Sequence, residues 1–204
     1  MDMLHAIRAA DLLLPDLLFV SDLRDAEIMA KCLDSAHTRA VITTFDAADA
    51  ASAVQRLHEW GADPLGMAEA INIVVGQRLA RRVCAHCAQP APPDSDDLDL
   101  ISRIYMLQQR KPEAIAGEFL RGRGCERCRG TGFRGRCGLF EVLSITPAIE
   151  AALIEGANLQ QLRDLAIADG METLVYDGLQ KARDGIIPLR ELRRVVTDLL
   201  TPGE

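Results

Sequence analysis

The sequence has no apolar run long enough to cross a membrane, because no stretch of about 18 uncharged apolar residues occurs in it. Its first residues also lack the pattern of a signal peptide, since Asp2, Arg8 and Pro15 interrupt them. Basic residues are outnumbered, with 23 Lys and Arg against 30 Asp and Glu, so the net charge of −7 disfavours a nucleic-acid binder. Without an export signal we expect a reducing compartment, where paired cysteines bind metal or do redox chemistry more often than they form disulfides.

Aromatic residues are scarce as well, at 4% of the chain. Hydrophobic residues nevertheless make up 49%, so we expect a soluble globular protein whose disorder is confined to the ends. The sequence shows no internal repeat and no segment of low complexity. A length of 204 residues suits one domain with a substantial core and a small appended module.

Two short apolar runs in the first quarter of the chain have the composition of buried parallel strands. One is LLFVSD at 17–22, and the other is AVITT at 40–44, which is rich in β-branched residues. Between them, small or apolar residues recur at helical spacing, at Ala26, Met29, Ala30 and Leu33. The sequence therefore predicts a βαβ unit.

Two helices are predicted between this unit and the first cysteine pair. The first has Asp46 or Asp49 as its cap and Gly61 at its end. The second covers residues 63–82 and opens with Asp63 as its cap and a proline at the first helical position. In this interpretation Asp46 is a helix cap and needs no role at a functional site.

The rest of the chain predicts mainly helices. A proline-rich turn leads into an acidic helix start, and apolar helical spacing continues through 101–110. The segment LFEVL at 139–143 predicts a strand. Capping residues and glycines divide the tail into four helices, which are expected at 146–156, 158–170, 173–185 and 188–200.

Four of the six cysteines form two Cys-x-x-Cys pairs, CAHC at 84–87 and CERC at 125–128. Each such turn presents two thiolates, and two turns complete the tetrahedral four-sulfur site that structural zinc prefers. The arginines and glycines after the second pair suit a turn whose amides point at sulfur and whose charges offset a dianionic site. We therefore predict a structural zinc site made by Cys84, Cys87, Cys125 and Cys128.

Two other interpretations of the cysteines stay open. A redox or iron–sulfur site is one of them; a redox site uses a Cys-x-x-Cys pair at a helix start, where the helix dipole lowers a thiol pKa, and leaves the second pair unexplained. Coincidence would leave four unligated cysteines. Cys32 and Cys137 are interpreted as small packing residues, and His86 is a weaker ligand candidate.

Four stretches of the sequence point to one family. They are PDLLFVSDLRDAE at 15–27, DPLGMAEAINIVVGQRLARRVCAHCAQP at 63–90, GCERCRGTGFRGRCGLFEVL at 124–143, and DGMETLVYDGLQKARDGIIPLRELRRVV at 169–196. They resemble, in order, the Walker B strand, the two halves of the tetracysteine module and the closing helices of the ATPases of type II secretion and type IV pilus assembly. The resemblance implies a RecA-like fold and, in the intact protein, binding of ATP and Mg²⁺.

The same resemblance implies where such a protein works and with what. It implies a cytoplasmic protein that lies at the inner membrane through its partners. Those partners are other ATPase subunits, in a hexameric ring, and an inner-membrane platform protein; no nucleic acid is expected.

The sequence departs from the family's pattern at the nucleotide site. A P-loop holds phosphates and Mg²⁺ with backbone amides, a lysine and a hydroxyl, but no Gly-Lys-Ser or Gly-Lys-Thr occurs here. Ser21-Asp22 stands where the family has Gly-Glu, which makes Asp22 the candidate catalytic acid, and Asp46 stands near a family histidine. We therefore expect a C-terminal fragment or a degenerate member, and the chain alone to be inactive.

The expected fold class is α/β, as the C-terminal part of a RecA-like P-loop ATPase domain with a partial parallel sheet, an inserted tetracysteine zinc module and a C-terminal helical bundle. The expected domains are a partial nucleotide-binding core at 1–82, the zinc module at 83–143 and a helical region at 144–204. The expected function is that of a secretion or pilus-assembly ATPase fragment. The alternative is a non-catalytic, zinc-stabilised docking module that contacts an ATPase ring or a membrane platform protein.

Overall fold

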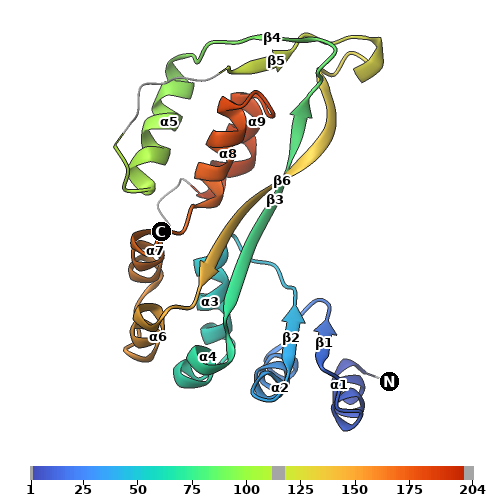
Figure 1. The fold of residues 1–204 in the computed structure, drawn as a ribbon, viewed down its shortest axis with the longest axis vertical. Coiled ribbons are helices and arrows are strands. Elements are labelled where there is room, and N and C mark those ends of the chain that lie inside the picture. Colours follow the sequence, from blue (N-terminus) through green and yellow to red (C-terminus); the bar gives the residue numbers. More distant parts are fainter. Residues whose placement is uncertain (1, 112–117, 200–204) are drawn as a thin grey trace. The chain divides into compact units, whose positions relative to one another are not determined.

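The structure, a computed structural model, describes residues 2–111 and 118–199 (Figure 1). The chain divides into two compact units. Unit 1 comprises Met1–Val74 and Leu143–Asp169, and unit 2 comprises Val75–Val142 and Gly170–Glu204. Among the described residues no helix combines the length and the apolar character that crossing a membrane requires.

Unit 1 contains the predicted βαβ unit. Strands β1 (Leu17–Val20) and β2 (Ala40–Thr43) pair in parallel, with helix α2 (Ala26–Ala36) between them in sequence. The apolar stripe of α2 differs from the predicted one, because Met29, Cys32 and Ser35 are buried while Ala30 is exposed. Cys32 therefore is the packing residue that the sequence predicted. Helix α1 (Met3–Leu12), which the sequence analysis did not predict, packs its Ile7 into the same core.

Four more helices complete unit 1: α3 (Ala50–Glu59), α4 (Pro64–Ala70), α6 (Pro147–Ile154) and α7 (Leu159–Ala168). Asp49 caps α3 by accepting a hydrogen bond from the backbone N–H of Ser52 at 2.8 Å. The interpretation of Asp46 as the cap is therefore wrong. Asp49 also accepts a hydrogen bond from Arg163 of α7 at 2.6 Å, so one carboxylate fixes the start of one helix against another.

The predicted helix over 63–82 is wrong beyond its first two turns. Helix α4 ends at Ala70, and Ile73–Val83 form strand β3, which pairs with β6 (Phe133–Ser144). An extended backbone is favoured by the β-branched residues Ile71, Ile73, Val74 and Val75, because two heavy atoms on Cβ crowd a helix but pack well on a pleated surface. Gly76 fits the same pairing, since a Cβ atom there would lie 2.8 Å from Cγ of Glu141.

Among its described residues, unit 2 contains most of the β3–β6 pair, a second strand pair, three helices and two short 3₁₀ turns. Strand β4 (Ala88–Pro90) pairs antiparallel with β5 (Leu120–Gly122), and neither strand was predicted. The helices are α5 (Ser95–Leu107), α8 (Leu174–Arg183) and α9 (Leu189–Val196), and the turns are η1 (Glu126–Cys128) and η2 (Thr197–Leu199). The acidic helix and the tail helices are thus confirmed; residue 200 lies outside the described residues.

The core of unit 2 surrounds a buried carboxylate, that of Glu191 in α9. Its Oε1 accepts hydrogen bonds from the backbone N–H of Arg81 at 3.0 Å and from Arg194 at 2.6 Å, and its Oε2 accepts from Arg81 Nη2 at 2.6 Å. Burial alone raises the pKa of the Glu191 carboxyl, but the hydrogen bonds from Arg194 and Arg81 outweigh it and lower the pKa to about 2. Glu191 therefore fastens the first turn of α9 to strand β3.

Replacing Glu191 by Gln should lower the free energy of unfolding by about 3 kcal/mol at neutral pH, because Arg81 and Arg194 lose their charged partner. The folded-state pKa of about 2 lies below the ordinary value of 4.5, so this stabilisation is present above pH 4.5 and is lost as the pH falls toward 2. Urea unfolding of both proteins at neutral and acid pH measures the difference, which should shrink in acid. Asp99→Asn removes an exposed α5 carboxylate and should change stability by less than about 0.5 kcal/mol; an equal loss in this control would contradict the assignment.

Candidate metal centre

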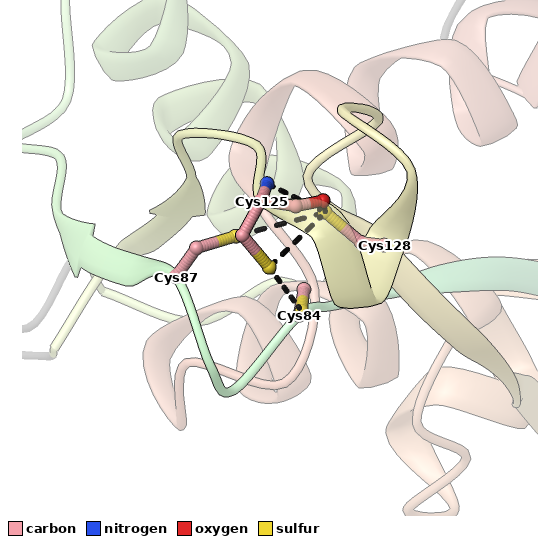
Figure 2. Close-up of side chains that lie close together, drawn as sticks. All are labelled: Cys84, Cys87, Cys125 and Cys128. Carbon is pink, nitrogen blue, oxygen red and sulfur yellow. Dashed lines mark hydrogen bonds between the residues drawn. The ribbon is translucent and has the colours of Figure 1, made fainter.

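The two cysteine pairs meet in unit 2. Figure 2 shows Cys84 and Cys87 turned toward Cys125 and Cys128, and all four sulfur atoms lie within 4.8 Å of one another. The Sγ–Sγ distances are 4.0 Å between Cys84 and Cys125, 3.8 Å between Cys87 and Cys128, and 3.7 Å between Cys125 and Cys128. A tetrahedral zinc ion with Zn–S bonds of about 2.3 Å needs sulfur atoms about 3.8 Å apart. The donor set and its spacing therefore fit zinc.

Backbone hydrogen bonds form each turn and join the two. Within the turns, the N–H of Cys87 donates to the carbonyl of Cys84 at 3.1 Å, and that of Cys128 donates to the carbonyl of Cys125 at 3.2 Å. Between them, the N–H of Cys84 donates to the carbonyl of Gly132 at 2.9 Å. The backbones of the two segments lie so close that residue 122 must be a glycine, because a Cβ atom there would lie 2.1 Å from the oxygen of Gly132. The glycine-rich sequence thus lets the second turn approach the first.

Amide donors and burial act in opposite directions on the thiols. The Sγ atom of Cys128 accepts hydrogen bonds from the backbone N–H groups of Cys125 at 3.1 Å and Gly132 at 3.2 Å. Burial raises the pKa of the Cys128 thiol, but these amides outweigh it and lower the pKa to about 6. Burial dominates at Cys87 and raises its pKa to about 11. The pKa of the Cys128 thiol therefore lies below that of the Cys87 thiol.

The remaining ligand candidates lie outside the sulfur cluster. The ring of His86 is exposed and its Nδ1 atom lies 3.0 Å from Nη1 of Arg127, across the two turns. Cys137 packs against the hydrophobic core of unit 2, as the sequence predicted. All six cysteines are free of disulfide bonds.

The candidate catalytic acid, Asp22, lies in unit 1, two residues after the end of β1. Its backbone N–H donates to Oγ1 of Thr44 at 3.1 Å, and its carboxylate accepts from Nε of Arg24 at 2.7 Å. Asp22 has a φ of +62°, a conformation that non-glycine residues adopt rarely and that often marks functional sites. Thr44 follows β2, so the carboxyl ends of two parallel strands meet here, as at the ligand-binding edge of α/β folds. Sequence reasoning missed Thr44, whose only signal was its position at a strand end.

Comparison with known proteins identifies the family. The family model described as "Type II/IV secretion system protein" matches residues 1–194. The chain belongs to this family.

Among solved structures, the fold is similar to the Legionella pneumophila ATPase DotB, with a TM-score of 0.64, 18% sequence identity and coverage of 97% of this chain and 42% of that one. A structure of the pilus retraction motor PilT with bound ADP also has a TM-score of 0.64, with 18% identity and coverage of 95% and 43%. The predicted RecA-like α/β fold is thereby confirmed.

Curated relatives in this family are secretion and pilus-assembly ATPases. The type IV pilus assembly ATPase PilB of Thermus thermophilus is 37% identical over 179 residues, which cover 87% of this chain and 20% of the relative. The type II secretion system protein E of Klebsiella pneumoniae is 32% identical over 183 residues, which cover 89% of this chain and 34% of the relative. The chain therefore spans between 20% and 34% of the length of these two relatives.

The purified chain should contain about one zinc ion per molecule, because four thiolates at tetrahedral spacing complete one site. Replacing both Cys84 and Cys125 by Ser should remove the zinc and loosen residues 84–140 first, since metal binding there contributes local folding energy. Elemental analysis and hydrogen exchange measure the two effects. The matched control is Cys32→Ser with Cys137→Ser, which should retain the zinc. Zinc content that survives the first pair of changes would contradict the site.

Zinc affinity should rise with pH. The pKa of Cys87 is raised to about 11, so near pH 7 its thiol must release a proton when metal binds. Each proton displaced makes the apparent affinity about tenfold stronger per pH unit. Competition against a chelator of known affinity between about pH 6 and pH 8 measures the slope. A slope of zero would show that all four sulfurs are already thiolates.

Proposed function

We propose that the chain is the C-terminal part of a secretion or pilus-assembly ATPase, whose intact form hydrolyses ATP to drive assembly of a pilus or pseudopilus and secretion of protein. The family match over residues 1–194 supports the assignment. So do two curated relatives, one named a type IV pilus assembly ATPase and the other a type II secretion system protein, which are about three to five times longer than the matched region.

The observation that carries this proposal is the bare face of the β1–β2 pair. Leu17, Phe19 and Ile42 are 52%, 60% and 51% exposed, and Phe19 lies directly opposite Ile42 in the register. Parallel sheets are covered on both faces in folded proteins, and two strands alone do not make a stable sheet. Further strands and helices of a larger nucleotide-binding domain would cover this face.

The chain contains some of the groups that such a domain needs for ATP hydrolysis and lacks others. Asp22 and Thr44 supply a carboxylate and a hydroxyl at the ligand-binding edge, where the family binds ATP and Mg²⁺. The chain contains no Gly-Lys-Ser or Gly-Lys-Thr, so the groups that cradle phosphates must come from outside these 204 residues. Zinc at the four cysteines would be structural, because four thiolates leave no open coordination position for a reaction.

The intact protein would work in the cytoplasm at the inner membrane. Its partners would be further ATPase subunits in a hexameric ring and an inner-membrane platform protein. The zinc module would serve as a rigid element of that assembly, since its cluster fixes two chain segments in one arrangement.

One observation favours a second function, that of a non-catalytic docking module. The chain contains no Gly-Lys-Ser or Gly-Lys-Thr. If no upstream segment supplies a P-loop, the protein is a family member that has lost the ability to hydrolyse ATP. In that case the zinc-stabilised unit 2 would contact a ring of active subunits or the platform protein without hydrolysing ATP.

The 204-residue chain should show no ATP hydrolysis above background, whereas the protein extended by its upstream coding sequence should hydrolyse ATP. In the extended protein Asp22→Ala should lower kcat about 100-fold, because precise placement at the reacting centre is lost. Phosphate release measures both. Asp16→Ala removes an exposed carboxylate just before β1 and serves as the matched control.

Two outcomes would decide against the ATPase fragment. Turnover by the 204-residue chain that disappears in Asp22→Ala would show that the phosphates are held within it. An upstream sequence without a P-loop would leave the docking module as the function.

A further inference from the structure

The two units carry opposite charge. Unit 1 has 6 Lys and Arg against 16 Asp and Glu, a net charge of −10, whereas unit 2 has 17 against 14, a net charge of +3. The net charge of −7 for the whole chain therefore conceals a strongly acidic unit and a basic one. Such a separation suits association between molecules, because every copy presents both signs.

The positive charge of unit 2 is concentrated beside the cysteine cluster. Residues 118–136 contain six arginines and two glutamates, a net charge of +4. Arg127 faces His86, but the other five are exposed and have no ion-pair partner among the described residues. We call these five the knuckle arginines: Arg121, Arg123, Arg129, Arg134 and Arg136.

Neutralising the metal site does not account for all of this charge. Four thiolates with one Zn²⁺ carry a net charge of about −2. The segment's +4 therefore exceeds what the cluster requires by about two charges. Exposed Arg82 at the end of β3 adds to the surplus. An anionic partner outside the cluster would satisfy it.

Unit 1 presents a matching acidic surface on α4 and α6, which pack against each other (Figure 1). Residues 57–74 and 143–162 contain no Lys or Arg. Glu69, Glu150 and Glu155 are exposed and have no ion-pair partner among the residues that the structure describes. We call the exposed side chains of these helices and Glu155 the α4–α6 surface.

The α4–α6 surface also carries apolar groups in the pattern of a docking face. Leu65 is 50% exposed and lies one turn from Glu69, and Ile154 is 51% exposed and lies one turn from Glu150. Residues four apart share one face of a helix. Each helix therefore offers an apolar side chain beside a free carboxylate, and such mixed surfaces are typical of protein interfaces.

We propose that the knuckle arginines of one molecule dock on the α4–α6 surface of a second copy. The contact is heterologous, since two different surfaces meet, so it repeats from copy to copy and builds a ring or a filament. Its charged pairs lie at exposed positions, so association weakens as salt rises. The proposal concerns self-association alone and does not depend on ATP hydrolysis.

A second copy fits the knuckle arginines better than a polyanion does. A nucleic acid or an anionic vesicle would offer these arginines anionic groups alone, whereas a second copy offers carboxylates beside the exposed apolar side chains of Leu65 and Ile154. The α4–α6 surface instead supplies three carboxylates on a folded element, and it is present at the same concentration as the arginines.

The experiment uses sedimentation velocity of the zinc-loaded chain at about 50 mM and about 500 mM salt. Arg134→Glu with Arg136→Glu, and separately Glu69→Lys with Glu150→Lys, should each weaken self-association about tenfold or more at low salt, because like charges then face each other. An equimolar mixture of the two variants should associate again, because the reversed surfaces complement each other. Only a direct contact predicts this recovery.

Matched controls separate the contact from general charge. Lys111→Glu changes the charge of unit 2 by the same amount per residue at an exposed position outside the knuckle arginines and should leave association unchanged. Arg134→Lys with Arg136→Lys keeps the charge and should retain most of the association. Zinc content and circular dichroism verify the fold of each variant; if the arginine variant loses zinc, the Glu69 and Glu150 variant still tests the contact from the other side.

Three results would overturn the proposal. One is self-association that neither double variant weakens, and another is a mixture that fails to associate again. The third is salt-sensitive binding of the wild-type chain to RNA or to vesicles of anionic lipid that is tighter than its self-association, which would assign the knuckle arginines to that partner.

Discussion

The four-sulfur cluster is the constraint on which the cysteine module depends. It joins residues that lie 41 positions apart, Cys84 to Cys125 and Cys87 to Cys128, with α5 in the connection between them. Closing so long a loop costs conformational entropy, and the three-residue strands β4 and β5 supply few hydrogen bonds to offset it. A metal ion bound by four thiolates would offset part of this cost, in addition to the apolar residues of α5 that pack into the core of unit 2.

The charged side chains of the protein fall into two groups, those paired within the fold and those left exposed without a partner among the described residues. The buried carboxylate of Glu191 is paired with two arginines, Arg81 and Arg194. Beside the cysteine cluster positive charge is not matched by carboxylates, because five exposed arginines have no ion-pair partner among the described residues. Buried charges must be paired to remain folded, whereas exposed ones are free to serve a second molecule. The proposed contact between copies uses only charges that folding leaves free.

Much of the local structure followed from local chemistry. The caps at Asp49, Asp63, Thr146, Asn158 and Thr173 lie where their side chains satisfy backbone N–H groups that a helix start leaves open. The two cysteine pairs were recognisable because metal chemistry requires a specific donor set at a specific spacing. The segment at 71–82 was misjudged because the prediction rested on the helix start at Asp63 and Pro64, which does not say where the helix ends, whereas the β-branched residues that follow favour a strand. Strands β4 and β5 gave no signal, since three residues are too few for a period.

The sequence by itself determined which side chains form the four-sulfur cluster, where the βαβ unit lies and to which family the chain is similar, because these depend on residue type and short spacing. Only the tertiary structure decided that Asp49 rather than Asp46 caps α3, because the choice depends on which carboxylate reaches the N–H of Ser52. It also decided which charges are paired: Arg81 binds a carboxylate 110 positions away, while Arg134 and Arg136 remain exposed. Ion pairing depends on distances across the fold, and distances between residues far apart in sequence are set by packing and not by composition.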